Sequence, residues 1–325
     1  MSGFGRLQYL RRIASAYLLR SHSQLNFWHD STQANARATS NVLCDYYMNF
    51  DEKARYAMTD GNGIPQLNYR GAIGLQYNPI AIAQWGLGNF NLFCRNDNAA
   101  AHNNFIKASD WLCENLSPNK NGVAVWSHNF DWEYRSTLRA PWYSGLAQGQ
   151  GISLLVRAYT ATNDDRYLEC AERAFKSFLT RTDRGGVTFT DTDGNFWFEE
   201  YLVSPPTHIL NGFIWAAWGV HDYFLATGSL QAKSLFEAAV KTLIANLTYY
   251  DLGFWSLYEQ SGTRLPMIAS PFYHRLHITQ LQVMQRLSGE TIFGDYADRW
   301  HAYARSRSNR TRALCYKGAF KLCYY

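Results

Sequence analysis

The sequence predicts a mainly α fold: an incomplete (α/α) barrel or toroid of helix hairpins, with short β-hairpins at the end that would carry an active site. The first observation behind this prediction is that apolar residues recur at helical spacing in pairs of segments joined by short turns. The second is that short β-prone pieces lie between these pairs. The open end of such a ring is the natural place for a cleft.

The helix signals begin at residues 99–116 and continue as three pairs. These pairs are 144–162 with 166–182, 209–226 with 230–246, and 276–287 with 291–304. Asn163, Gly228 and Gly289 lie in the turns that separate the two helices of each pair. Residues 186–201 predict a β-hairpin that turns at Asp193-Gly194, and residues 123–126 and 253–258 are expected to be similar short strands.

The domain organisation that we expect is one structural domain with two extensions. Residues 1–60 should form a helical segment docked on the main domain, since Leu10, Ile13, Tyr17 and Leu18 share one helical face. Residues 61–325 should form the barrel, ending in a basic tail at 305–312. The N-terminal residues lack the features of a signal peptide, and no apolar run is long enough to span a bilayer.

Composition narrows the function classes. Of 325 residues, 16% are aromatic, and Tyr and Trp suit both wet clefts and sugar rings. The net charge of +5 permits an acidic ligand, but no basic stripe, zinc spacing or RNA-binding signature predicts nucleic acid as a partner. The six cysteines form no C-x-x-C pair and are expected to be free thiols, which favours a cytoplasmic location. A homodimer is left open.

No nucleotide-binding loop, GxSxG elbow or HExxH motif is present, and we expect neither a metal nor a cofactor. The unusual segment is the start of the helix at 144–162, which carries Gly145, Gly149 and Gly151 together with Gln148 and Gln150. Each interior glycine costs roughly 1 kcal/mol relative to alanine. Two explanations stay open: close helix packing with glutamines that tether a loop, or direct contact with a substrate.

Six short pieces, taken together, resemble the catalytic domain of the heparosan (heparan-type) D-glucuronyl C5-epimerases. They occur in the family's order: YNPIAIAQWGL at 77–87, WYSGLAQGQGISLLVRAY at 142–159, EEY at 199–201, ILNGFI at 209–214, YDLG at 250–253 and YHRLHITQLQ at 273–282. The resemblance covers roughly residues 65–305. Animal members of the family carry a β-rich domain and a membrane anchor ahead of this region, which we expect to be largely absent here.

The resemblance implies inversion at C5 of glucuronate within an acidic, heparosan-like polysaccharide, giving iduronate. It implies that Glu200, Tyr201, Tyr273 and Tyr258 are the catalytic residues. The family has an arginine where this chain has Ser261, so Arg264 or Arg275 is expected to contact the substrate carboxylate instead. The residues expected to bind substrate are Tyr77, Gln84, Trp142, Tyr143, Gln148, Gln150, Asn211, Arg264, His274, Arg275 and His277.

The implied reaction removes a proton beside a carboxylate and returns one on the opposite face of the sugar, so it needs two acid–base groups. Ionising a tyrosine at pH 7 costs about 4 kcal/mol, so a cation or several hydrogen bonds must offset much of this. His274, Arg275 and His277 are the candidates for that role. A polysaccharide lyase shares the first step and is the main alternative, followed by a glycoside hydrolase, which needs two carboxylates, and a non-catalytic polysaccharide-binding protein.

Overall fold

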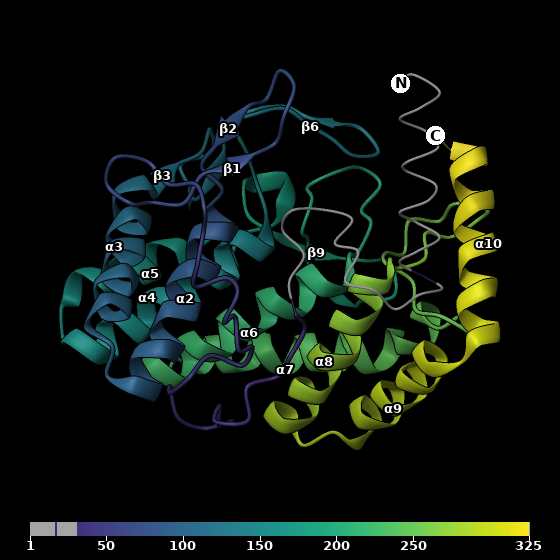
Figure 1. Ribbon diagram of the computed structural model, residues 1–325. Helices are drawn as coiled ribbons and strands as arrows, with labels where there is room; N and C mark the ends of the chain where they lie inside the picture. The colour runs from purple at the N-terminus through teal and green to yellow at the C-terminus, as the bar shows by residue number, and fades with distance from the viewer. Residues whose placement is uncertain (1–16, 18–30, 325) are drawn as a thin grey trace. The chain divides into compact units, whose positions relative to one another are not determined.

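A computed structural model describes residue 17 and residues 31–324 of the chain. The chain divides into two compact units, Asn35–Leu243 and a second unit made of Met1–Ala34 with Ile244–Tyr325. Each unit is built mainly from helices joined by short turns, as Figure 1 shows. The predicted mainly α fold is therefore confirmed, and the grouping of residues 61–325 into one domain stays a prediction.

The first unit contains three helix hairpins. Their helices are α2 (Pro79–Asn96) with α3 (Ala99–Asn115), α4 (Gly145–Thr162) with α5 (Asp165–Phe175), and α6 (Leu210–Thr227) with α7 (Leu230–Asn246). A short 3₁₀ helix, Thr182–Arg184, follows α5. The predicted helix at 166–182 is therefore shorter than expected, because residues after Phe175 form tighter turns, such as the bond from the Phe178 amide to the Phe175 carbonyl.

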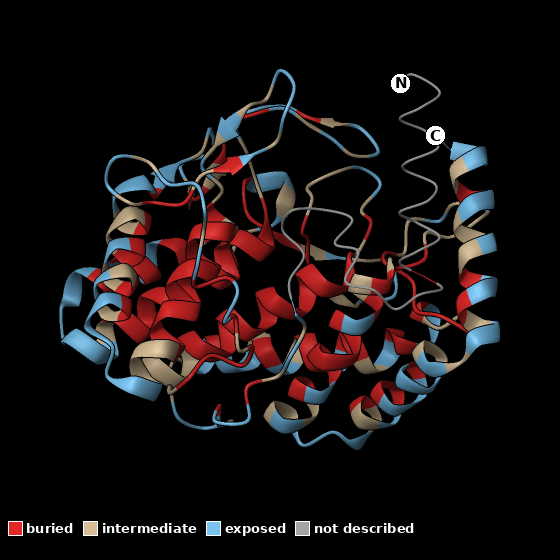
Figure 2. Cartoon of the chain, viewed as in Figure 1, coloured by how far each residue is buried: buried red, intermediate tan, exposed pale blue. Residues whose placement is uncertain are grey.

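Helices alternate between buried and amphipathic along the chain. Helix α4 is buried without interruption from Gly145 to Ala158, and α6 from Leu210 to Tyr223. Helices α3 and α5 bury one stripe each, so their outer faces are exposed in Figure 2. A helix that is apolar all round belongs inside a fold and a striped one outside. This alternation of inner and outer helices is the arrangement of an (α/α) barrel.

Helix α2 was not predicted, although local signals mark both of its ends. Its N-cap is Asn78, whose side chain accepts hydrogen bonds from the amides of Ile80 and Ala81, and Pro79 occupies the first helical position. Asp97 ends the helix in a left-handed conformation. The sequence lacks the usual alternation of an apolar and a polar helix face here, because α2 is buried on almost all sides.

Five two-stranded antiparallel ribbons belong to the first unit, one ahead of α2 and four between its helices. They are β1 (Leu67–Asn68) with β2 (Leu75–Gln76), β3 (Ser117–Pro118) with β4 (Ala124–Val125), β5 (Ser127–His128) with β8 (Trp142–Tyr143), β6 (Trp132–Glu133) with β7 (Thr137–Leu138), and β9 (Thr188–Thr190) with β10 (Phe196–Phe198). The β9–β10 ribbon confirms the predicted hairpin, and Gly194 adopts the positive φ of 83° that its turn requires. In Figure 1, β1, β2, β3 and β6 gather beyond one end of α2 and α3.

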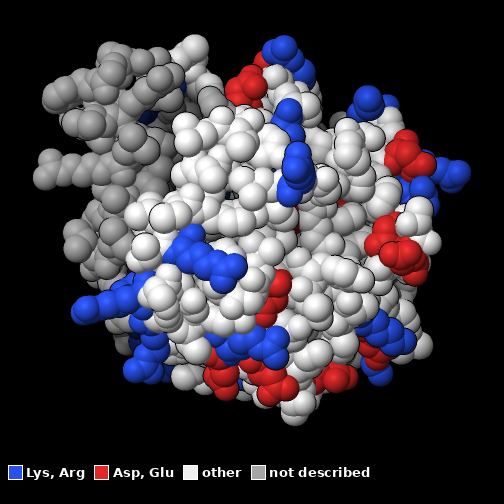
Figure 3. Space-filling view, turned by 90° about the vertical axis from the view of Figure 1, so that its right-hand side faces the viewer, with Lys and Arg blue, Asp and Glu red and all other residues white. Residues whose placement is uncertain are grey.

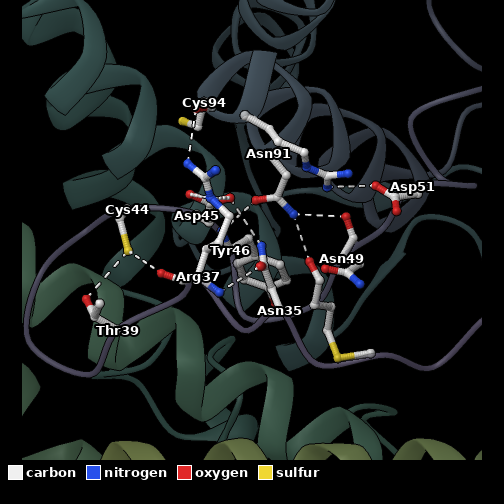
Figure 4. Close-up of polar contacts among 12 residues, drawn as sticks. Asn35, Arg37, Thr39, Cys44, Asp45, Tyr46, Asn49, Asp51, Asn91 and Cys94 are labelled. Carbon is white, nitrogen blue, oxygen red and sulfur yellow. Dashed lines mark hydrogen bonds and ion pairs between the residues drawn. The ribbon is translucent and has the colours of Figure 1, made fainter. Parts of the chain in front are cut away.

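Polar contacts hold residues 35–51 against the C-terminal half of α2 (Figure 4). Asn91 accepts a bond from the Tyr46 amide at 2.7 Å and donates to the carbonyls of Met48 and Asn49 at 2.8 and 2.9 Å. Nearby, Arg37 donates to the Cys94 carbonyl at 3.2 Å. The segment has no helix or strand of its own to pair its backbone, so one buried asparagine supplies three of the bonds it needs.

A buried ion pair joins α4 to α6. Arg157 contacts Asp222 through two bonds of 2.7 and 3.2 Å, and both side chains are almost completely buried. Arg157 also donates to the carbonyl of Cys44 at 3.0 Å, and the Tyr47 hydroxyl donates to Asp222 at 2.6 Å. These extra hydrogen bonds are what a desolvated ion pair needs to be stable.

The second unit is built around α8 (Pro271–Ser288), α9 (Thr291–Arg305) and α10 (Arg307–Tyr324), with a 3₁₀ turn at Leu247–Tyr250. Helix α8 begins five residues earlier than predicted because Ser270 caps it and Pro271 starts it. The predicted basic tail is the helix α10. Residues 253–258 form single bridges in place of the expected strand, at Ser256 and Leu257.

The predicted helical segment at 1–60 falls in part on residues 1–16 and 18–30, which lie outside the described residues. Residues 31–60 are described and contain turns, bends and isolated bridges but no helix, so this part of the prediction is wrong. Tyr17 is described and buried: its ring lies 5.9 Å from that of Trp255, and its hydroxyl donates to the Ala269 carbonyl at 3.4 Å. All six cysteines are free thiols. Within the described part of the chain, none of the helices has the length and apolar character needed to cross a membrane.

Candidate active site

The predicted catalytic glutamate lies where a strand ends beside two helix starts. Glu199 and Glu200 directly follow β10, and the Gly145 amide at the start of α4 donates to the Glu199 carbonyl at 2.8 Å. A Cβ on Gly145 would lie 2.8 Å from that same carbonyl oxygen. A side chain at position 145 would therefore separate β10 from α4, and the glycine is what brings Glu200 to the helix starts.

Glu200 packs against the first turn of α6. A Cβ on Gly212 would lie only 2.1 Å from Glu200 Oε2, so the absence of a side chain there creates the space for the carboxylate. Asn211 Nδ2 donates to the same oxygen at 3.3 Å, and Glu200 is buried. No side chain caps α6 at Ile209, and the positive end of a helix dipole favours a negative charge. The Asn211 amide and the start of α6 both favour a negative charge at this position.

The neighbouring Glu199 ties down the segment after Tyr201. Its carboxylate is buried, lies 2.5 Å from His208 Nδ1 and accepts from the His208 amide at 3.3 Å. His208 has a φ of 47°, which a residue with a side chain adopts at a cost of about 1–3 kcal/mol. Its ring also stacks on Trp197 at 4.2 Å. These contacts fix both ends of the segment that carries Tyr201.

Tyr201 belongs to a group of partly exposed aromatic rings. Its ring lies 5.7 Å from Trp142 and 4.6 Å from Tyr134. Trp142 is held in place by a hydrogen bond from Nε1 to the Phe130 carbonyl at 2.8 Å and by stacking on His128 at 3.9 Å. Burial lowers the pKa of His128 to about 3, so this imidazole is a neutral, aromatic support for the indole. The structure thus brings Glu200, Tyr201 and Trp142 into one region.

The glycine-rich start of α4 is explained by helix packing. A Cβ on Gly149 would lie 2.6 Å from Ala216 Cα, and one on Gly219 would lie 2.2 Å from the Gly149 carbonyl oxygen. Gly151 makes room for the ring of Trp126 in the same way. The backbones of α4 and α6 are therefore in direct contact. This close approach is possible because Gly149 and Gly219 have no side chains.

The predicted substrate-binding glutamines serve the same architecture. Gln148 accepts from the Trp126 amide and donates to the Trp126 carbonyl, both at 3.2 Å, so it holds the strand region before β5. Gln84 Nε2 donates to Gln150 Oε1 at 3.1 Å, which links α2 to α4. All three glutamines are buried. Of the two explanations that the sequence left open, these contacts favour the first, close helix packing with glutamines that tether a loop.

Two further predicted residues of the first unit have different surroundings. Tyr143 is half-buried beside Trp142, and burial raises the pKa of its phenol. Tyr77 is exposed; its hydroxyl donates to Asp60 at 2.7 Å and its ring lies 5.7 Å from Trp111. The hydrogen bond to Asp60 raises the pKa of Tyr77, so this phenol is neutral.

In the second unit the structure brings together the other two predicted catalytic tyrosines. The rings of Tyr258 and Tyr273 lie 4.9 Å apart at 59°. Tyr273 is in the first turn of α8, where its amide donates to Ser270 Oγ at 3.3 Å, and the Tyr258 amide donates to the Met267 carbonyl at 2.8 Å. A helix cap and a backbone bridge therefore fix the two phenols relative to each other.

The two histidines predicted to support these tyrosines are buried and neutral. Ser256 Oγ lies 2.7 Å from His274 Nδ1 and 3.1 Å from His277 Nδ1. Burial lowers the pKa of His274 to about 3 and that of His277 well below its usual value. Neither ring carries a positive charge at neutral pH, so the idea that they act as cations beside Tyr273 is wrong. Of the three candidates named from the sequence for that role, Arg275 remains.

Sequence reasoning missed Tyr134 and the Glu199–His208 pair. Neither contact has a sequence signal. Tyr134 and Tyr201 are 67 residues apart in the sequence, and His208 contacts Glu199 only because its backbone adopts a positive φ. Among the described residues, no three His, Cys, Asp or Glu side chains gather as metal ligands do.

Comparison with known proteins gives a family and a fold. The family model for the D-glucuronyl C5-epimerase C-terminus matches residues 120–302. A D-glucuronyl C5-epimerase of Caenorhabditis elegans is 32% identical over 215 residues, which cover 62% of this chain and 35% of that protein. An uncharacterized protein of Methanocaldococcus jannaschii is 31% identical over 179 residues, which cover 54% of this chain and 56% of that protein. The chain thus spans only part of the length of both relatives.

Two solved structures of cellobiose 2-epimerases share the fold. The enzyme of Spirochaeta thermophila has a TM-score of 0.52 and 12% identity, covering 93% of this chain and 85% of its own. That of Bacillus thermoamylovorans has a TM-score of 0.54 and 10% identity, covering 93% and 87%. At such low identity the likeness concerns the fold alone, and it confirms the predicted class of an (α/α) barrel with few short strands.

Proposed function

Because the chain belongs to the family of D-glucuronyl C5-epimerase C-terminal domains, we propose that it inverts C5 of D-glucuronate residues within a polysaccharide to give L-iduronate. The observation that carries the proposal is the setting of Glu200. Its carboxylate lies over the first turn of α6 in a space that Gly212 leaves, next to the partly exposed ring of Tyr201. A base that removes a carbon-bound proton needs such a fixed position.

The chemistry divides into two proton transfers. In the first, a base takes the proton from C5 and negative charge spreads onto the sugar carboxylate. In water a glutamate carboxylate is ionised at neutral pH, whereas ionising a phenol costs about 4 kcal/mol. Glu200 is therefore the base that we propose for glucuronate. In the second transfer a phenol donates its proton to the opposite face of C5. Glu200 then releases the proton that it took to water, and the phenolate regains one, so both groups return to their starting states.

Tyr201, which follows Glu200 in the same unit, is the phenol that we propose for this second transfer. Tyr258 and Tyr273 remain proposed catalytic residues on the resemblance alone. Asn211 would orient Glu200, and Trp142 and Tyr143 would contact the sugar. Gln84, Gln148 and Gln150 would act by holding the helix starts in place. The growing charge on the substrate carboxylate needs a positioned cation. Arg264 and Arg275, both exposed, are the proposed groups, since Ser261 occupies the position of the family's arginine.

We propose a heparosan-like uronate polymer as the substrate. On the face shown in Figure 3, Lys and Arg side chains are interspersed with Asp and Glu side chains. Attraction between scattered exposed charges is weak and screened by salt. Recognition of an acidic polymer would therefore depend on residues positioned at the site. The free thiols of all six cysteines support a reducing, cytoplasmic compartment, which we keep as part of the proposal.

The test is to incubate the protein with heparosan in deuterated water and to analyse the polymer by NMR and by size-exclusion chromatography. Epimerisation predicts deuterium at C5, the appearance of iduronate and an unchanged chain length. Shortened chains with ultraviolet-absorbing unsaturated ends would instead establish a lyase, which shares the first proton transfer. Binding without isotope exchange would identify a polysaccharide-binding protein, an alternative that Ser261 at the position of the family's arginine keeps open.

The role of Tyr273 has its own test. Tyr273→Phe removes the phenol oxygen but keeps the ring that contacts Tyr258. We expect this variant to lose deuterium exchange while binding heparosan as the wild type does. Full exchange by Tyr273→Phe would remove Tyr273 from the mechanism.

A further inference from the structure

A series of aromatic rings continues from Tyr201 across the short ribbons of the first unit. Tyr134, in the turn between β6 and β7, lies 4.6 Å from Tyr201, and Tyr201 lies 5.7 Å from Trp142. From Trp142 the contacts continue to Phe130 at 6.0 Å and from Phe130 to Tyr69 at 4.5 Å. We call the rings of Tyr69, Phe130, Trp132, Tyr134, Trp142 and Tyr201 the aromatic wall.

All rings of the wall except that of Phe130 are partly exposed. Tyr69, Trp132, Tyr134, Trp142 and Tyr201 each keep an intermediate share of their surface accessible, whereas Phe130 is buried behind them. Hydrophobic packing alone is served best by complete burial, and tyrosine and tryptophan also carry a polar group at the ring edge. Rings that are both half-buried and amphipathic suit a ligand that has apolar faces and hydroxyl groups, as a pyranose ring does.

The wall is also rigid. Tyr69 accepts a hydrogen bond from Asn78 Nδ2 at 2.6 Å, and Asn78 is the residue that caps α2. Burial raises the pKa of Tyr69 to about 12, so its phenol is neutral and keeps its proton. Trp142 is fixed by Phe130 and His128, as described above. Rings that are ordered beforehand lose little conformational entropy when a ligand binds, which favours affinity.

Charged side chains flank the wall at the β6–β7 turn. Arg135 follows Tyr134 directly and is exposed. Of the acidic groups nearby, Glu133 accepts bonds from the Thr137 hydroxyl at 3.0 and 3.2 Å, and Asp131 is paired with Arg139. Arg135 therefore places a positive charge in the turn that carries Tyr134.

We propose that the aromatic wall binds a sugar ring of the polymer next to the uronate on which Glu200 and Tyr201 act. This assignment rests on the proposed function, because Tyr201 belongs to both the wall and the proposed catalytic group. The occupant is a pyranose of the same polymer chain, stacked on Tyr134 and Trp142. The wall would make the protein select polymer over a single sugar.

The test compares Tyr134→Ala with the wild type, using heparosan and glucuronate itself as two ligands. We expect the KM for C5 deuterium exchange and the calorimetric Kd for heparosan to rise about tenfold, the equivalent of about 1.4 kcal/mol. The kcat should be unchanged, and competition by free glucuronate should be equal in both proteins. Tyr134→Phe, which keeps the ring, should restore the KM.

A matched control is Phe224→Ala, which removes another half-buried ring from the same unit, at the opposite end of α6 from Asn211. It should leave the KM and the Kd for heparosan unchanged. If Tyr134→Ala unfolds, Tyr134→Leu replaces it, since leucine keeps apolar volume without a ring.

Unchanged KM and Kd in a folded Tyr134→Ala or Tyr134→Leu protein would overturn the proposal, as would an equal loss of affinity for free glucuronate. The calorimetric arm does not depend on catalysis. If the wild type binds heparosan without exchange, the proposed function fails, yet a tenfold weaker Kd of Tyr134→Ala would still support the wall.

Discussion

The most direct structural prediction concerns Gly212→Ala, a change of one methyl group at the first turn of α6. The new Cβ would lie 2.1 Å from Glu200 Oε2, 2.7 Å from Glu200 Cβ and 2.8 Å from Glu200 Cδ. Ordinary contacts of a Cβ begin at 3.4 Å, so the carboxylate must retreat by about 1 Å or more. The substitution therefore displaces the proposed base without removing it.

The two consequences of Gly212→Ala differ in size. Displacing a catalytic group by about 1 Å costs about 10²-fold in rate, so we expect kcat/KM for C5 exchange to fall at least that far. Stability changes less, because overpacking costs about 1–3 kcal/mol while replacing a helical glycine by alanine returns up to about 1 kcal/mol. The assay is deuterium exchange, accompanied by denaturant unfolding of the same preparation.

Gly318→Ala in α10 is the matched control, since nothing lies within 4 Å of the Cβ that it adds. It should keep full activity and be as stable as the wild type or slightly more stable. Wild-type exchange rates in a folded Gly212→Ala protein would refute the reasoning, because Glu200 would then either lie elsewhere or take no part in the reaction.

Three further predictions concern stability. Gly219→Ala forces a Cβ to within 2.2 Å of the Gly149 carbonyl oxygen, and denaturant unfolding should show a loss of about 1–3 kcal/mol or more. Arg157→Met leaves Asp222 buried without its partner and should cost about 3–5 kcal/mol, which the double variant with Asp222→Leu should largely recover. His274 has a folded-state pKa of about 3, below its unfolded value of about 6.5, so its neutral form stabilises the protein above pH 6.5. Stability should therefore fall as the pH drops from about 6.5 towards 3, and His274→Gln should flatten this part of the profile.

Local signals in the sequence account well for the helix hairpins. The turns at Asn163, Gly228 and Gly289 occur where the pattern predicted them, since each residue adopts the left-handed conformation that ends a helix. The hairpin at Gly194 was found for the same reason. By contrast, α2 is buried on almost all sides and has no polar stripe, so its sequence pattern did not predict a helix. That Asn78 caps this helix was recognised only from the structure.

The candidate site residues also divide into those that the sequence identified and those that only the tertiary fold reveals. The resemblance named Glu200 and Tyr201, and the structure explains the glycines around them as positions where backbones and a carboxylate approach closely. The neutral state of His274 and His277 could not be read from their spacing, because it follows from their complete burial around Ser256. Tyr134 was equally hidden, since its contact with Tyr201 is made by the tertiary fold alone.

The central claim is that Glu200 takes the proton from C5 of a glucuronate residue in a polymer. The measurement that tests it most directly is the release of deuterium from heparosan labelled at C5, comparing Glu200→Gln with the wild type under single-turnover conditions. Glutamine keeps the size of the side chain and its contact with Asn211 but cannot accept the proton. We predict that the wild type releases the label to water and that Glu200→Gln, folded and still binding heparosan, retains it. Release of the label by Glu200→Gln at the wild-type rate would contradict the account.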